Sequence, residues 1–183
     1  ITVEVHSGLT HPHLFDIDTN ELWGRSCPHP DLPNDPVRCL CPEHTLLHLA
    51  IHGFRDLAIL SHSLVDTYEI VSQWKIDWKL LCETAAQWEV EAITHYWLLQ
   101  AWLLLDASIP PWVLAQLQPR DWRTMGLDLA FTRGRNTHGA FSSTGNRLVQ
   151  IASLFCGTSG LGRVLEFLSY RRKMVASPSI APD

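Results

Sequence analysis

Apolar side chains recur at intervals of three and four residues over most of the chain from residue 42 onward. This spacing is typical of helices that bury one face, and it predicts four consecutive helices. The first begins at Pro42 and includes Phe54, and the others cover residues 60–74, 78–88 and 91–105. The fourth is apolar nearly all round, so we expect it at the buried centre of a helical bundle.

The same pattern predicts which side chains face the core. Trp97 and Leu104 of the fourth helix are expected to be substantially buried. The side chains expected to face inward from the second helix are Leu64, Val65, Tyr68 and Val71. Those expected on the inner side of the third helix are Leu80, Leu81, Ala85 and Trp88. The helical spacing of the tryptophans, including Trp74, Trp78, Trp88, Trp97 and Trp102, favours core or rim positions over an aromatic ligand cage.

Capping residues and prolines predict where further helices begin. A short helix is expected from about Asp18 to Arg25, with Asp18 or Thr19 as its cap and Glu21 in its first turn. Asp77 is expected to cap the third bundle helix. Pro110 and Pro111 break the chain and begin a short helix through Leu117, and another helix is expected from Asp121 to Phe131.

The opening residues alternate in the way that a half-buried strand does. Ile1, Val3 and Val5 point one way, and Thr2, Glu4 and His6 point the other, until Gly8 and Thr10 end the pattern. No convincing partner strand follows, and a lone strand leaves its own backbone groups unsatisfied. It pairs either with a second copy or with strands upstream of residue 1, and we favour the second interpretation.

The expected fold class is therefore mainly α, a helical bundle with one N-terminal strand. The expected segments are a strand over residues 1–10, a proline-rich connection with a short helix over 11–41, the bundle over 42–131, a flexible loop over 132–145, C-terminal helices over 146–176 and a disordered tail over 177–183.

Composition narrows the class of protein. With 46% hydrophobic and 18% charged residues the chain is not disordered, and its net charge of −5 without a basic stripe argues against a nucleic-acid partner. No apolar run approaches the ~20 residues of a membrane span. The odd number of cysteines favours free thiols in the cytoplasm over a disulfide framework or a structural metal. They are Cys27, Cys39, Cys41, Cys82 and Cys156.

A row of histidines is the first candidate for chemistry. His44, His48 and His52 are spaced four residues apart and so share one helical face. Such a row could serve a metal-dependent hydrolase, but Leu49 follows His48 where a zinc protease has glutamate. We expect no zinc here, and His48 or His52 to form a structural hydrogen bond with Asp66 or a backbone carbonyl.

Carboxylates are the second candidate. Glu4 shares the polar face of the predicted strand with His6, and a carboxylate fixed on a strand suits a magnesium ion. The alternative is an ordinary exposed strand face. Asp16 and Asp18 have the D-x-D spacing of a metal-binding pair, but capping by Asp18 explains that pattern without a metal.

Several blocks of the sequence together resemble a family of bacterial nucleotidyltransferases of the polymerase-β-type superfamily. They occur in the family's order, and they are Val3 to Thr10, Phe15 to Arg25, Cys39 to Arg55, Leu64 to Val71 and Ile76 to Val90. The resemblance implies a mixed sheet with a G-S turn, a D-x-D pair and a third carboxylate on a neighbouring strand. Two Mg²⁺ ions would bridge these carboxylates and a nucleoside triphosphate, whose α-phosphorus an acceptor hydroxyl attacks.

Only the third carboxylate is matched, by Glu4, with His6 as a possible neighbour of the metal site. The G-S turn and the D-x-D pair precede this strand in the family, so we expect them upstream of residue 1. The resemblance thus implies the C-terminal helical part of an enzyme that transfers a nucleoside monophosphate to an unknown acceptor. This part alone is expected to hold no Mg²⁺ and to be inactive. The alternative is a non-catalytic helical module that binds a protein partner.

Overall fold

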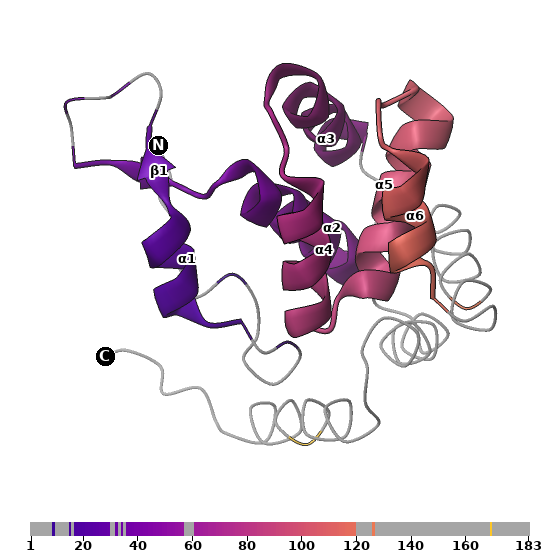
Figure 1. The fold of residues 1–183 in the computed structure, drawn as a ribbon, viewed down its shortest axis with the longest axis horizontal. Helices are drawn as coiled ribbons and strands as arrows, with labels where there is room; N and C mark the ends of the chain where they lie inside the picture. Colours follow the sequence, from indigo (N-terminus) through magenta and orange to yellow (C-terminus); the bar gives the residue numbers. More distant parts are fainter. Residues whose placement is uncertain are drawn as a thin grey trace, which may run out of the picture.

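The computed structural model describes residues 17–29, 36–56 and 61–119, together with residues 9, 15, 32, 34, 126 and 169. This part of the chain is mainly helical, as the sequence predicts, with one small antiparallel sheet (Figure 1). Glu4 and His6 lie outside the described residues. So do nearly all residues of the helix expected over 121–131 and of the segments expected over 132–183.

Six helices and two short strands make up the described part of the chain. In chain order these are α1 (Thr19–Arg25), β1 (Cys27–Pro28), β2 (Arg38–Cys39), α2 (Pro42–Asp56), α3 (Ser61–Gln73), α4 (Trp78–Gln87), α5 (Glu91–Leu105) and α6 (Pro111–Leu117). The predicted short helix, the four bundle helices and the proline-initiated helix are therefore all present.

The helix ends follow the capping residues that the sequence offers. Asp18 caps α1 by accepting a hydrogen bond from the Asn20 backbone N–H at 2.8 Å. Asp77 caps α4 by accepting one from the Leu80 N–H at 3.0 Å. Both bonds satisfy backbone donors that the first helical turn leaves without partners. The interpretation of Asp18 as a helix cap is confirmed.

The core lies around α5, which packs against α2, α3, α4 and α6. Figure 1 shows α5 with α3 and α6 beside it, whereas α1 and the strands lie at the other side of the molecule. Every residue of α5 from Ala92 to Leu98 is buried, and so is Ala101. The prediction that this all-round apolar helix forms the centre of the bundle is confirmed, as is the burial of Trp97.

Three predicted core positions are wrong. Val65 and Tyr68 of α3 are 45% and 37% exposed, because α3 turns Leu64 and the polar Thr67 inward instead. Thr67 takes the inner position because it accepts a hydrogen bond from Trp97. Leu104 is 55% exposed, because it lies on the outer side of the last turn of α5, whereas Leu105 of the same turn packs against the core.

The hairpin of β1 and β2 was not expected from the sequence. Cys27 faces Cys39 and Pro28 faces Arg38 in antiparallel register. Arg38 clamps the base of the hairpin, because its guanidinium donates to the Ser26 hydroxyl at 2.6 Å and also to the Ser26 carbonyl. Two strands of two residues are too short to produce a recognisable alternation of polar and apolar side chains.

Candidate functional site

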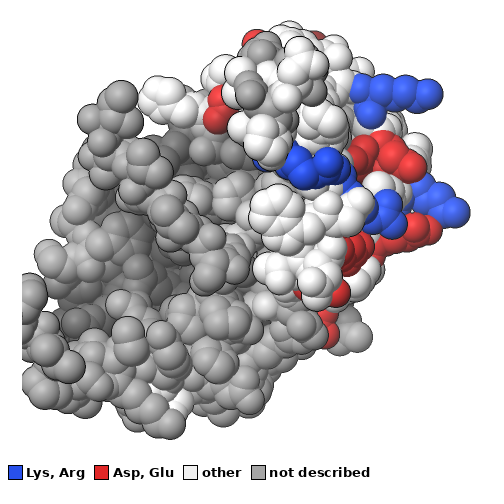
Figure 2. Space-filling model, turned by 90° about the vertical axis from the view of Figure 1, so that its left-hand side faces the viewer, with Lys and Arg blue, Asp and Glu red and all other residues white. Residues whose placement is uncertain are grey.

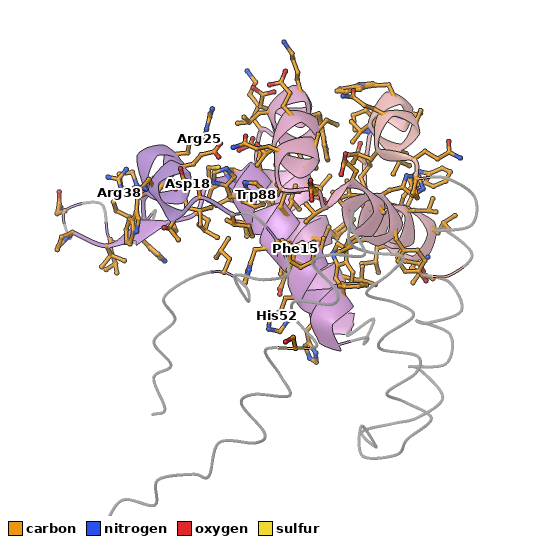
Figure 3. The ribbon with its side chains drawn as sticks, turned by 90° about the horizontal axis from the view of Figure 1, so that it is seen from below. Phe15, Asp18, Arg25, Arg38, His52 and Trp88 are labelled. Atoms are coloured by element: carbon orange, nitrogen blue, oxygen red, sulfur yellow. The ribbon has the colours of Figure 1, made fainter. Side chains whose placement is uncertain are left out.

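The connection that follows the predicted Glu4 strand is anchored on the bundle. Phe15 and Leu22 are buried in the same core as the inner residues of α2, and Leu9 and Ile17 pack against that core. Figure 3 shows Phe15 lying over α2. The chain is therefore packed against the helices at Leu9, which is five positions after Glu4.

This anchoring limits where Glu4 lies. Glu4 and Leu9 are five positions apart, and an extended chain spans at most about 3.3–3.6 Å per residue. The Glu4 backbone is thus at most about 18 Å from that of Leu9. A site that uses the Glu4 carboxylate is therefore tied by the chain to within about 18 Å of the Leu9 backbone, plus the length of the glutamate side chain.

The histidines on α2 differ in their surroundings. His44 is fully buried, and its ring packs on that of Trp88 with the centroids 5.1 Å apart. Burial lowers the pKa of His44, so its imidazole is neutral at pH 7. Among the described residues, neither ring nitrogen of His44 nor Nε1 of Trp88 has a hydrogen-bond partner. His44 is therefore a neutral residue of the core, and it does not provide a charged group to a functional site.

His48 and His52 lie on the next two turns of α2 and are only half-buried. Their rings meet edge to face, with centroids 5.9 Å apart and an interplanar angle of 66°. Figure 3 shows His52 pointing away from the other helices, in the C-terminal half of α2. Asp66 lies on the exposed side of α3. A hydrogen bond of His48 or His52 with Asp66 or a backbone carbonyl stays a prediction.

Glu43 is a buried carboxylate with a structural task. Its Oε1 accepts a hydrogen bond from the Asp77 backbone N–H at 2.8 Å and so joins the start of α2 to the cap of α4. It also lies in the first turn of α2, where the helix dipole favours a negative charge. Glu43 is thus engaged in the fold rather than offered to a ligand.

The donor atoms of this face do not fit a magnesium ion. Mg²⁺ prefers carboxylate oxygens, whereas the α2 row presents imidazole nitrogens. Throughout the described ranges, no group of three or more histidine, cysteine, aspartate or glutamate side chains could hold a metal ion. Glu4, which the resemblance implies as a magnesium ligand, lies outside the described residues.

Sequence reasoning missed a further buried histidine, His95 on α5. Its Nδ1 lies 2.9 Å from the carbonyl oxygen of Leu114, to which it donates a hydrogen bond that joins α5 to α6. Burial lowers the pKa of His95, and the bond to Leu114 opposes this effect. A single histidine in an apolar helix gives no sequence signal of such a partner 19 positions away.

Charge on the described surface is mixed in sign. On the face drawn in Figure 2, lysine and arginine side chains lie among aspartate and glutamate side chains, with uncharged residues between them. No described helix combines the length and the apolar character needed to cross a membrane.

Comparison with known proteins gives one match. Residues 1–106 match a family described as "Uncharacterised nucleotidyltransferase". The matched range begins with the predicted Glu4 strand and ends directly after α5. Neither the curated proteins nor the solved structures contain a significant match to the chain.

Proposed function

The chain belongs to the uncharacterised nucleotidyltransferase family, since the match covers residues 1–106 of 183, and we propose that it forms the helical part of an enzyme that transfers a nucleoside monophosphate. The family assigns nucleotidyl transfer as the activity and a nucleotide as the general substrate. The finer proposal is that the donor is a nucleoside triphosphate and that an unknown acceptor receives the nucleotide.

The anchoring of Leu9 and Phe15 on the core supports this proposal most directly. A carboxylate that holds a reacting group must be fixed in position, and a strand end that is tied to a packed bundle meets this need. The helices beside it then form one wall of the site. We assign this wall to the acceptor side, where it orients the attacking hydroxyl.

Glu4 is the proposed metal carboxylate, and His6, two residues further on the same strand face, is its proposed neighbour. Bound Mg²⁺ would supply charge neutralisation for the triphosphate. The remaining carboxylates are proposed, from the family resemblance alone, to come from a catalytic sheet that precedes residue 1. The 183 residues alone are accordingly proposed to be inactive, because one carboxylate does not define the geometry of two ions.

The test compares the 183-residue chain with a longer protein that includes the residues encoded upstream of Ile1. Pyrophosphate release is measured with each nucleoside triphosphate and Mg²⁺, and nucleotide binding is measured by calorimetry. We expect turnover and binding by the longer protein and neither by the 183-residue chain. Robust turnover by the 183-residue chain contradicts the assignment of Glu4 as one of several required carboxylates.

A second candidate function is a non-catalytic module that binds a protein partner. Four large apolar side chains that are exposed at the end of α5 and the start of α6 favour it, because exposed apolar surface can serve as an interaction site. These are Trp102, Leu103, Leu104 and Trp112. A longer protein that binds no nucleotide and turns none over would favour this function over transfer.

A further inference from the structure

Two thiols face one another across the β1–β2 hairpin. Cys27 and Cys39 are partners in the antiparallel register, and their Sγ atoms are 3.7 Å apart. Both are half-buried free cysteines. Each sulfur also lies close to the other strand, with Cys39 Sγ 3.6 Å from the Cys27 carbonyl oxygen. The hairpin thus keeps the two sulfurs together.

This arrangement suits a disulfide bond. Facing residues of an antiparallel pair have Cα atoms about 4.5–5.5 Å apart, within the range of about 4.4–6.8 Å that disulfides span. The strands therefore need no rearrangement, and side-chain rotation brings the sulfurs to bonding distance. Arg38 already holds the two ends of the hairpin together through Ser26.

We propose that Cys27 and Cys39 are a reversible oxidation site, which a hydroperoxide converts to an intramolecular disulfide. In the first step the Cys27 thiolate attacks the hydroperoxide, the O–O bond breaks, and Cys27 becomes a sulfenic acid while the leaving alkoxide or hydroxide takes up a proton. In the second step Cys39 displaces water from this sulfenic acid, and the S–S bond forms. With hydrogen peroxide, two thiols and one peroxide thus give one disulfide and two waters.

The surroundings of the two thiols indicate which of them resolves the sulfenic acid. Burial and the adjacent Cys27 thiol raise the pKa of Cys39, which disfavours its thiolate, and we therefore give Cys39 the resolving role. Cys41 is two residues further along the chain, and burial raises its pKa also. The Cys27 sulfur is in contact with the Cys39 sulfur, at 3.7 Å. Among the described cysteines, the sulfur that resolves a Cys27 sulfenic acid is therefore Cys39.

Oxidation would close the loop of residues 27–39 and fix the connection between α1 and α2. A closed loop restricts the unfolded chain, so the oxidised protein is expected to unfold at a higher temperature than the reduced one. This site depends on the hairpin alone and is independent of the proposed nucleotidyl transfer.

The chain offers a direct test, because trypsin separates the relevant cysteines. Cleavage after Arg25 and Arg38 gives a peptide of residues 26–38 with Cys27, and cleavage after Arg55 gives a peptide of residues 39–55. The full chain is treated with hydrogen peroxide, its remaining thiols are alkylated, and the non-reduced digest is examined by mass spectrometry. We expect the two peptides to be linked, with loss of two of the five thiols and full reversal by dithiothreitol.

Cysteine-to-serine variants identify which two cysteines form the disulfide bond. Cys27→Ser and Cys39→Ser should abolish the linked peptides, whereas the matched control Cys41→Ser should retain them at the wild-type rate. Circular dichroism confirms that each variant is folded. A disulfide within residues 39–55, stable sulfinic acid on Cys27, or loss of the link in Cys41→Ser would each overturn the proposal.

Discussion

The indole N–H of Trp97 donates a buried hydrogen bond to the hydroxyl oxygen of Thr67 at 3.0 Å, and so α5 is joined to α3 inside the core. The Thr67 hydroxyl in turn donates to the Ser63 carbonyl at 2.8 Å. A buried indole N–H without a partner is costly, so this bond decides which side of α3 faces inward.

We expect Thr67→Val to destabilise the protein by about 1–3 kcal/mol, because Trp97 Nε1 is left buried without an acceptor. The matched control is Thr94→Val, since the buried Thr94 hydroxyl has no hydrogen-bond partner among the described residues. This control should leave stability unchanged or raise it. Urea unfolding measures both variants, and an equal loss in the two would contradict the role given to Thr67.

Gly53 on α2 permits the close approach of Trp97. A Cβ atom at this position would lie 2.2 Å from the Trp97 ring, which is much closer than van der Waals contact allows. We expect Gly53→Ala to destabilise the bundle by about 1–3 kcal/mol through overpacking. Gly24→Ala on α1 is the control, because a Cβ there meets open space and alanine favours the helix by about 0.5–1 kcal/mol. Thermal unfolding should therefore shift down for Gly53→Ala and up for Gly24→Ala.

The buried histidines predict the pH dependence of stability. Burial lowers the pKa values of His44 and His95 from the ordinary 6.5, so below that pH the unfolded chain binds more protons than the folded one. Stability is therefore expected to be fully present above pH 6.5 and to fall as the pH drops from there toward the folded pKa values.

The variant His44→Leu removes one of the two buried histidines and so tests its contribution separately. It removes two ring nitrogens that have no hydrogen-bond partner among the described residues, and it should flatten the loss of stability below pH 6.5. Urea unfolding between about pH 5 and 8, the range in which histidine titrates, gives the slope. A slope equal to that of the wild type would show that His44 is not held neutral by the fold.

Local signals predicted most of the helices. Asp18, Pro42, Asp77 and Pro111 each begin or cap a helix through their own backbone chemistry, so the sequence was enough to place them. Thr67 was missed because its inward position depends on Trp97, a partner 30 positions away. Leu104 was placed wrongly because an all-round apolar helix does not indicate which of its sides the neighbouring helices cover.

The candidate site was less predictable than the fold. The spacing of His44, His48 and His52 correctly predicted one helical face, but the burial of His44 against Trp88 depends on how α2 and α4 pack. The Cys27–Cys39 contact requires a hairpin that local propensity does not indicate. Glu4 and His6, which carry the proposed chemistry, lie outside the described residues, so their roles stay predictions.

The central claim is that Glu4 holds the reacting centre of a nucleotidyltransferase. The most direct measurement is the rate of pyrophosphate release by the longer protein that carries these residues, compared between Glu4→Gln and Glu83→Gln. Glu83 is an exposed residue of α4, paired with Lys79, and serves as the matched carboxylate control. We predict a loss of about 10²–10³-fold or more for Glu4→Gln with an unchanged circular dichroism spectrum, and wild-type activity for Glu83→Gln. Wild-type turnover by Glu4→Gln would contradict the claim.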